Sequence, residues 1–259
     1  MVAILRSLPG TSAHVLLEAV AYFVAARVYW RTARTQPRPA RATDRWLLVA
    51  CAISGAAAGS KGLHVLEHLP TLWQSGTAAD WLGGKSVLGG LIGGTLAVEA
   101  GKLAVGWRLS TGDAYVAAIA IGLMIGRLGC QLSGLWDQTY GTPTGLPWGW
   151  DYGDGVPRHP VALYEIVLVG CAWLGVRRWQ GAPPGARFAA FLALYCAIRL
   201  VLEGFKPPFG PVTAAELLAT LPVARYAGLT AIQWSALAGL CGYLALLRHR
   251  LRPTTASNR

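Results

Sequence analysis

Charged residues are scarce in this chain. Only 14% of its 259 residues are Asp, Glu, Lys or Arg, whereas 54% are hydrophobic, and an ordinary soluble domain has about a quarter of its residues charged. The 32 glycines follow no collagen-like period. These absences exclude an intrinsically disordered chain, a collagen-like fibre and a typical water-soluble domain.

Features that define other protein classes are missing as well. The five cysteines form no C-x-x-C pair, so we expect no disulfide framework or zinc ribbon. The segment Met1–Ser12 lacks the basic head, apolar stretch and cleavage site of a secretory signal, so the first apolar segment is expected to stay in the protein. The net charge of +11 is spread over loops, which argues against a nucleic-acid partner. Without internal repeats, one domain over residues 1–259 suffices.

Apolar stretches of about 20 residues, the length of a membrane-spanning helix, recur along nearly the whole chain. Their lengths and the Gly- and Pro-rich loops between them predict about seven transmembrane helices. The predicted spans are His14–Tyr29, Trp46–Leu69, Ser86–Trp107, Ala114–Leu135, Pro160–Val176, Arg187–Glu203 and Tyr226–Leu247. We therefore expect an all-α polytopic membrane protein.

The basic residues predict its orientation. With the N-terminus outside, the inner loops fall in segments 27–45, 102–108, 177–187 and 248–259, which hold 15 of the 23 Lys and Arg residues. This distribution satisfies the positive-inside rule and places the C-terminus in the cytoplasm. The outer loops are rich in Gly, Pro and Trp, as expected at a lipid interface.

Ionisable residues inside the predicted spans are candidate functional residues, because a charge at bilayer depth costs at least about 2.5–3.5 kcal/mol. They are Glu18, Lys61, Glu67, Glu99, Arg127, Glu165, Arg199 and Glu203. Mutual pairing or snorkelling to the span ends is the alternative explanation. Arg127 and Arg199 lie near the outer ends of two spans, so we expect both guanidinium groups to face one outward cavity.

The segment Arg158-His159-Pro160 precedes the fifth span, and Tyr164 and Glu165 follow one turn later. Proline disfavours helix at the preceding residue, so His159 is expected at the helix start with a free imidazole. Arg158 would add a phosphate donor beside the helix N-terminus. An interfacial cap with a snorkelling tyrosine is the alternative.

Two shorter motifs allow two interpretations each. Gly89-Gly90-Leu91-Ile92-Gly93-Gly94 has the G-x-x-x-G spacing of packed membrane helices, but Gly89 and Gly90 could also let a ligand approach. His64-Val65-Leu66-Glu67-His68 matches an H-x-x-E-H zinc motif, although Lys61 one turn earlier opposes a cation. A headgroup-facing or structural role is the alternative.

Together these residues resemble the bacterial prolipoprotein diacylglyceryl transferase family. The resemblance runs from the glycines Gly84–Gly93 through Gly126-Arg127-Leu128-Gly129 and Gly134 to Arg158-His159-Pro160 with Leu163-Tyr164-Glu165, then to Arg199, Glu203 and Gly228–Gln233. It implies transfer of the diacylglyceryl group of phosphatidylglycerol, or another anionic phospholipid, to the cysteine thiol of a prolipoprotein or related membrane acceptor. It also implies a bacterial cytoplasmic membrane and a site on the periplasmic side.

The resemblance assigns expected roles to individual residues. Arg127 and Arg199 would stabilise the phosphate leaving group, His159 would accept the thiol proton, and Tyr164 and Glu165 would orient the imidazole or the lipid. The expected substrate-binding residues are Arg158, Gly89, Gly90, Gly134 and Glu203, together with Gln131, Asp137 and Lys61, which this chain supplies where the family pattern does not predict them. No metal or other cofactor is expected.

The chain departs from the family pattern at several positions. Leu88 occupies the place of a histidine, and Cys130, Ser133 and Leu135 occupy places where the family carries Asn, Asn and Glu. We interpret the chain as a divergent member with a rebuilt acceptor half. A non-catalytic lipid-binding or assembly protein and an intramembrane zinc hydrolase at His64, Glu67 and His68 are the alternatives.

Overall fold

The computed structural model describes residues 10–37, 39, 41–76, 78–137, 139–207 and 223–252. Its α-helices are α2 (Gly10–Ala33), α3 (Ala42–Ser75), α4 (Ala78–Leu82), α5 (Val87–Ala104), α6 (Val116–Ser133), α7 (Val161–Arg178), α8 (Ala186–Glu203) and α9 (Ala231–Leu251). Two short 3₁₀ helices, η1 (Gly112–Tyr115) and η2 (Gly134–Asp137), flank α6. The expected helical class is confirmed, with two small hairpins added: β1 (Trp150–Asp151) with β2 (Pro157–Arg158), and β3 (Arg225–Tyr226) with β4 (Leu229–Thr230).

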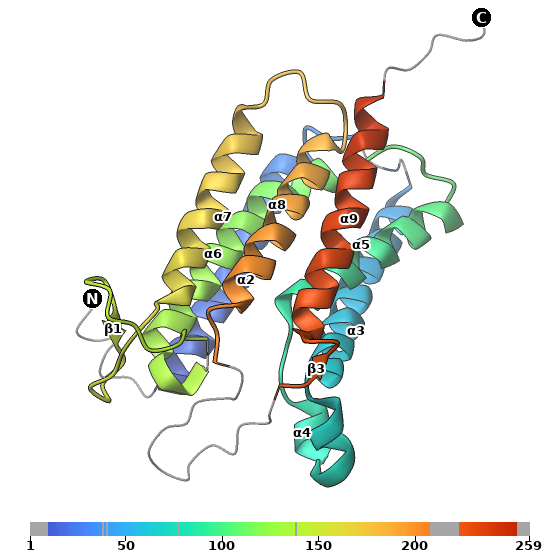
Figure 1. Ribbon diagram of the computed structural model, residues 1–259. Coiled ribbons are helices and arrows are strands. Elements are labelled where there is room, and N and C mark those ends of the chain that lie inside the picture. Colours follow the sequence, from blue (N-terminus) through green and yellow to red (C-terminus); the bar gives the residue numbers. More distant parts are fainter. Residues whose placement is uncertain are drawn as a thin grey trace, which may run out of the picture.

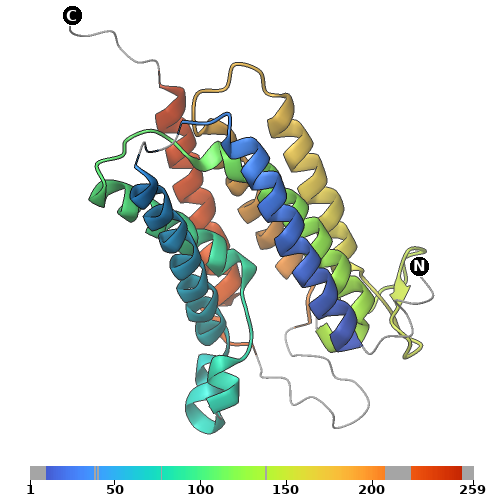
Figure 2. The ribbon, with the colours of Figure 1, turned by 180° about the vertical axis from the view of Figure 1, so that it is seen from behind.

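The seven long helices of the described residues form a bundle in which most large contacts join consecutive long helices, and the contact of α2 with α6 joins two distant ones. α2 packs on α6, α3 on α5, and α8 on α9, while α7 contacts both α6 and α8. Figures 1 and 2 show α2, α6 and α7 on one side of the bundle and α3, α5 and α9 on the other. α2 begins at the end that carries both hairpins and α4, whereas α9 ends at the opposite end (Figure 1).

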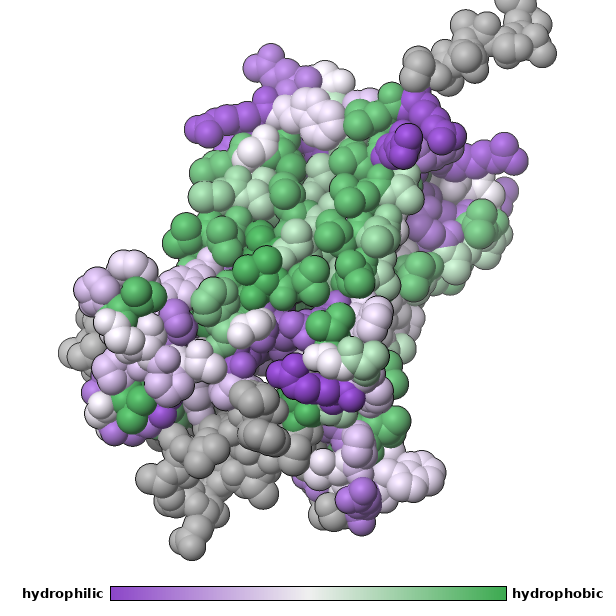
Figure 3. Space-filling view, viewed as in Figure 1, coloured by the Kyte–Doolittle hydropathy of each residue, from purple (hydrophilic) through white to green (hydrophobic). Residues whose placement is uncertain are grey.

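The helices have the lengths and surfaces of membrane spans. By length and composition, the helical segments Ala42–Gln74, Val87–Ala104 and Gly112–Ser133 can each cross a membrane. Figure 3 shows an apolar band across the middle of the face formed by α7, α8 and α9, with polar residues above and below it. The chain is therefore a multi-pass membrane protein. The count of seven spans and their direction stay predictions, and within the basic segments residues 38, 40 and 253–259 lie outside the described residues.

Glycines allow α3 and α5 to approach backbone to backbone. A Cβ added at Gly89 would collide with the carbonyl oxygen of Gly59, and one at Gly93 would collide with that of Gly55. Gly90 also faces α3, with the carbonyl oxygen of Ala56 3.4 Å from the position of an added Cβ. These contacts give the motif a role in helix packing, and substrate binding by Gly89 and Gly90 stays a prediction.

The last long helix begins later than the sequence pattern predicts. Tyr226 was the expected start, but residues 225–230 form the β3–β4 hairpin, whose turn holds Ala227 at φ 48° and Gly228 at φ 85°. Helix α9 starts at Ala231 because Thr230 and Gln233 form a capping box, each side chain bonding the other's backbone N–H. Polar capping chemistry decides the boundary here, whereas hydropathy does not detect it.

Helix α8 lies at the centre of the core. Phe191, Leu192, Tyr195 and Cys196 are each at most 1% exposed, and α8 contacts α6, α7 and α9. Leu88, which stands where the family carries a histidine, is also buried in this core at 2% exposure. Polar residues near the end of α8 are therefore enclosed by neighbouring helices.

Candidate active site

Glu165 is the centre of a buried polar network at the hairpin end of the bundle. Its Oε2 atom forms an ion pair with Arg127, 3.0 Å from Nε, and accepts a hydrogen bond from Arg199 Nη1 at 2.8 Å. Its Oε1 atom accepts a hydrogen bond from the Tyr195 hydroxyl at 3.0 Å. Glu165 is 1% exposed, so α6, α7 and α8 enclose a carboxylate whose two oxygens both have polar partners.

The network continues along the end of α8. Arg199 Nη2 donates to Glu203 Oε2 at 2.9 Å, and Lys206 Nζ lies 3.3 Å from the same oxygen. Among the described residues, the connected group contains the cations Arg127, Arg199 and Lys206 and the carboxylates of Glu165 and Glu203, and Glu67 of α3 lies within electrostatic range of Arg199, Glu203 and Lys206. Cations clustered in a low-dielectric interior favour an anionic ligand.

This geometry bears on two expectations about the ionisable residues. The two arginines converge on Glu165, which lies between them. Glu165 also contacts Tyr195, while an outward cavity and a role of Glu165 in orienting His159 or the lipid stay predictions. Charge explains this pairing. Inside a low-dielectric bundle, two guanidinium groups stabilise a carboxylate more strongly than an imidazole ring does.

His159 is oriented by aromatic residues. Its Nδ1 lies 3.3 Å from the Tyr164 hydroxyl oxygen, which accepts a hydrogen bond from Trp148 Nε1 at 2.9 Å. The ring also packs edge-on against Phe205, with 5.0 Å between centroids. Pro160 occupies the N-cap of α7 rather than its first helical position, so His159 stands just outside the helix, as the X-Pro pattern predicts.

Arg158 holds the β1–β2 hairpin together. Its Nη1 and Nη2 atoms each donate to one carboxylate oxygen of Asp154 at 2.7 Å, and its guanidinium lies 5.1 Å from the centroid of the Tyr140 ring. The Arg158 partner lowers the pKa of Asp154. Both terminal nitrogens are thus engaged within the hairpin, and a phosphate contact of Arg158 stays a prediction.

Gln131 and Gly134 lie beside Tyr152 of the hairpin loop. The Tyr152 hydroxyl donates to Gln131 Oε1 at 3.1 Å, and burial raises the pKa of Tyr152 to about 12. Gln131 Nε2 is buried and has no hydrogen-bond partner among the described residues. Gly134 has a φ of 65°, which favours glycine, and lies against Tyr152. The amide of Gln131 therefore offers a buried donor to a ligand.

Lys61 serves a different part of the bundle. Its ammonium donates to the carbonyl oxygens of Gly83 and Gly84, in the segment before α5. This contact holds the segment between α4 and α5 against α3, and the expected role of Lys61 in substrate binding stays a prediction. Asp137, another expected substrate-binding residue, lies beside His14 of α2, with 2.9 Å between Oδ1 and Nδ1.

The H-x-x-E-H motif does not form a converging ligand set. The rings of His64 and His68 lie 4.9 Å apart. Among the described residues, one group of three or more potential metal ligands converges, and it contains neither of these histidines nor Glu67. His64 instead packs against Gly84, where an added Cβ would overlap its ring. The zinc hydrolase hypothesis is therefore not supported.

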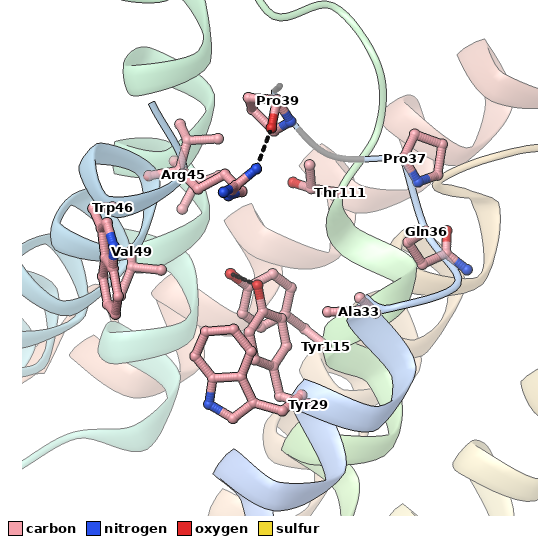
Figure 4. A pocket seen from close by; sticks show the side chains of 14 residues that line it. Tyr29, Ala33, Gln36, Pro37, Pro39, Arg45, Trp46, Val49, Thr111 and Tyr115 are labelled. Atoms are coloured by element: carbon pink, nitrogen blue, oxygen red, sulfur yellow. Dashed lines mark hydrogen bonds between the residues drawn. The ribbon is translucent and has the colours of Figure 1, made fainter. Parts of the chain in front are cut away.

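A pocket of about 240 Å³ lies at the opposite end of the bundle, among α2, α3 and α5. Figure 4 shows the stacked Tyr29 and Tyr115 rings on one side and Trp46 on the other. Arg45 crosses its mouth and donates to the carbonyl oxygen of Pro39 at 3.1 Å. This pocket contains none of the residues of the Glu165 network.

Three members of the site were missed by sequence reasoning. Tyr195 was overlooked because a tyrosine in an apolar span carries no charge signal, and Lys206 because it follows the predicted end of its span. Asp154 lies in the turn between β1 and β2, and its pairing with Arg158 could not be assigned from the sequence. The i, i+3 spacing of Glu203 and Lys206 was the available signal.

Comparisons with known proteins identify the family of this chain. The family model of prolipoprotein diacylglyceryl transferases matches residues 11–247. The phosphatidylglycerol–prolipoprotein diacylglyceryl transferase of Geobacter sulfurreducens is 36% identical over 154 residues, 54% of this chain and 58% of that protein. The enzyme of the same name from Bordetella parapertussis is 32% identical over 172 residues, 62% of this chain and 64% of that protein. These alignments cover less than two thirds of each relative. Because the family model matches well over half of the chain, this protein belongs to the prolipoprotein diacylglyceryl transferase family.

Proposed function

We propose that this protein transfers the diacylglyceryl group of phosphatidylglycerol, or a similar anionic phospholipid, to the cysteine thiol of a prolipoprotein or related membrane acceptor. The observation that carries the proposal is the Arg127–Glu165–Arg199 network, buried at the hairpin end of the bundle. Family membership and the names of the relatives, which specify this lipid and this acceptor, agree with it.

The clustered cations of the network support binding of the lipid phosphate. Arg127, Arg199 and Lys206 lie together around Glu165 and Glu203, and guanidinium groups form strong charge-assisted hydrogen bonds with phosphate oxygens. Arg127 bonds Glu165 through Nε, which leaves its terminal nitrogens directed to other partners. Arg127 Nη1 lies 3.7 Å from Cys130 Sγ, so Nη2 is the donor best placed for a phosphate oxygen.

The reaction would exchange one bond for another at a single carbon of the diacylated glycerol. This is the carbon that is bonded to the phosphate ester oxygen. The acceptor thiolate attacks this carbon, a carbon–sulfur bond forms, and the carbon–oxygen bond breaks. Glycerol phosphate leaves with the electron pair, and the product is a thioether. Arg127 and Arg199 would stabilise the charge that develops on the leaving group, in a site where water does not screen it.

His159 would take the thiol proton. A thiol has a pKa near ~8.5 in water, so a base beside it raises the thiolate fraction at neutral pH. If His159 Nδ1 donates to the Tyr164 hydroxyl, at the observed 3.3 Å, Nε2 is the proton acceptor. Trp148 would hold the Tyr164 hydroxyl in place, which repeats the base-and-orienter arrangement of nucleophilic enzymes.

Binding of the acceptor would involve the hairpin side of the site. The buried and unpartnered Nε2 of Gln131 supports a hydrogen bond to a substrate carbonyl or glycerol oxygen. Gly134 beside it carries no side chain that would obstruct such an approach. Glu203 would act indirectly, by positioning Arg199.

The orientation and location complete the proposal. Seven spans of one domain would cross the bacterial cytoplasmic membrane with the N-terminus outside. The last turns of α7 and α9 carry Arg177, Arg178, Arg248 and Arg250, which supports an inner position for that end of the bundle. The Glu165 network then lies toward the periplasm, where a translocated acceptor would reach it.

The test is product analysis with purified protein. Wild-type protein in micelles containing phosphatidylglycerol and a peptide with an acceptor cysteine should add one diacylglyceryl group to the peptide, detected by mass spectrometry. Glu165→Gln should abolish transfer, whereas Glu99→Gln, the same change at an exposed site on α5, should not. His159→Gln should bind phospholipid but not transfer it. Absence of product with wild-type protein across anionic phospholipids and thiol peptides would contradict the proposal.

A further inference from the structure

A second polar cluster joins three elements at the hairpin end of the bundle. His14 comes from α2, Cys130 from α6 and Asp137 from η2. Each side chain offers one potential metal-ligand atom, and these three atoms all lie within 4.8 Å of one another. Cys130 is buried and the others are partly buried. An imidazole, a thiol and a carboxylate in this proximity form the donor set of a transition-metal site.

The His14 imidazole carries the main observation. Its Nδ1 atom is shielded from solvent and forms no hydrogen bond of acceptable geometry, although Asp137 Oδ1 is only 2.9 Å away. A buried ring nitrogen without a hydrogen bond is costly. Two ligand atoms that lie close together but are not aligned as donor and acceptor can both point toward a common third atom.

The groups around the cluster have the arrangement of an outer ligand shell. The second oxygen of Asp137 accepts a hydrogen bond from the Thr139 hydroxyl at 2.8 Å, which leaves Oδ1 to face His14. On the other side of the ring, Glu18 Oε2 lies 3.8 Å from His14 Nε2. A carboxylate behind a metal-binding histidine fixes its tautomer and raises its basicity.

Two cations border the cluster, and both already have anionic partners. Lys85 pairs with Glu18 at 2.8 Å, and Arg127 pairs with Glu165 at 3.0 Å. Arg127 Nη1 also lies 3.7 Å from Cys130 Sγ. This sulfur would be an anionic thiolate when bound to a metal. The thiolate and Asp137 would together balance the charge of a divalent ion.

We propose that His14, Cys130 and Asp137 bind one Zn²⁺ ion, with water in the fourth position. Thiolate, imidazole and carboxylate donors in one site favour zinc over magnesium or calcium, which prefer oxygen ligands. The ion would fasten the start of α2 to the end of α6, the helix that carries Arg127. Zinc here is a positioning element for the helix ends and takes no part in the transfer chemistry of the proposed function.

A metal-free ion pair between His14 and Asp137 is the competing arrangement. Both arrangements explain the 2.9 Å approach, but only a metal site requires the sulfur of Cys130. Replacing Cys130 with serine nearly preserves side-chain shape and removes the soft ligand. The thiol therefore separates the two explanations.

The first experiment measures metal content. Protein is purified without a histidine tag and dialysed against micromolar zinc. Elemental mass spectrometry should then detect about one zinc per chain. Cys130→Ser and Asp137→Asn should each lower the zinc affinity at least tenfold. Cys171→Ser, at an exposed cysteine of α7, and His64→Ala, in the H-x-x-E-H motif, should keep the full content.

The second experiment tests the ligands directly and does not depend on enzyme activity. Cobalt added to the metal-free wild-type protein should produce a thiolate-to-cobalt charge-transfer band, and Cys130→Ser should lack this band while retaining wild-type helical circular dichroism. Zinc should also raise the melting temperature of the wild type but not that of Cys130→Ser. Equal zinc content in wild type and folded Cys130→Ser, or no zinc in the wild type, would overturn the proposal.

Discussion

Glu165 on α7 and Arg199 on α8 are 34 positions apart in the sequence, yet Oε2 and Nη1 lie 2.8 Å apart in the interior of the bundle. The same carboxylate oxygen also pairs with Arg127. Removal of one partner from such a group leaves a buried charge without compensation, which is more costly than loss of an exposed ion pair. This relationship leads to the first two predictions.

Arg199→Lys should reduce transfer about 100-fold, although the charge is unchanged. A lysine cannot bond Glu165 and Glu203 through two separate nitrogens as Arg199 does, and loss of one oriented donor typically costs ~10²–10³ in rate. The measurement is the rate of peptide lipidation. Arg177→Lys, at the far end of α7, serves as the control. Normal transfer by Arg199→Lys would show that the paired geometry is unimportant.

Tyr195→Phe should lower the free energy of unfolding by about 1–3 kcal/mol, because a buried carboxylate loses a donor. The matched control is Tyr243→Phe, which removes a hydroxyl bonded to the neutral Thr95 at 3.0 Å and should cost less. Thermal or denaturant unfolding in detergent measures both. A larger loss for Tyr243→Phe would indicate that Glu165 does not depend on Tyr195.

Gly89→Ala should destabilise the protein by about 1–3 kcal/mol, because the added methyl group meets the backbone of α3 at Gly59. The adjacent Gly90→Ala provides a sharp comparison. Its nearest neighbour would be 3.4 Å away, and alanine favours helix by ~1 kcal/mol, so this variant should be neutral or slightly stabilised. Similar melting temperatures for both variants would contradict the proposed backbone contact between α3 and α5.

Asp154→Asn should loosen the β1–β2 hairpin, which is seen as faster hydrogen exchange in residues 150–158. The pKa of Asp154 is lowered by Arg158, so the pair stabilises the hairpin above the ordinary aspartate pKa of about 4 and is lost as pH falls through the lower folded value. The difference in exchange between variant and wild type should therefore disappear in that acidic range. A difference that persists at lower pH would assign the effect to another contact.

The orientation predicts which loops are accessible from outside. Single cysteines introduced at Thr142 or Gly145 should react with an impermeant thiol reagent in intact cells, whereas cysteines at Thr35 or Thr43 should be protected until the membrane is permeabilised. The exposed Cys171 and Cys241 are first replaced by serine. The reverse labelling pattern would place the Glu165 network on the cytoplasmic side.

The helical architecture could be predicted from the sequence because its signal is local. A membrane span must satisfy its own backbone hydrogen bonds, so a long apolar segment indicates a helix wherever its neighbours lie. The expected spans overlap all seven long helices. The errors occur at ends such as Tyr226, where a glycine turn and a capping box in the described chain override hydropathy.

The importance of Arg127, Glu165 and Arg199 could also be predicted, because an ionisable residue in an apolar span requires an explanation. Their partners could not. Which carboxylate meets which guanidinium depends on how α6, α7 and α8 are rotated and packed, and a single sequence carries no information on contacts between helices. Tertiary structure likewise decided that Arg158 binds Asp154 and that His14 lies beside Cys130 and Asp137. Hydropathy sets the identity and length of each helix through its own contact with lipid, whereas electrostatic pairing depends on distances between helices that only the assembled bundle defines.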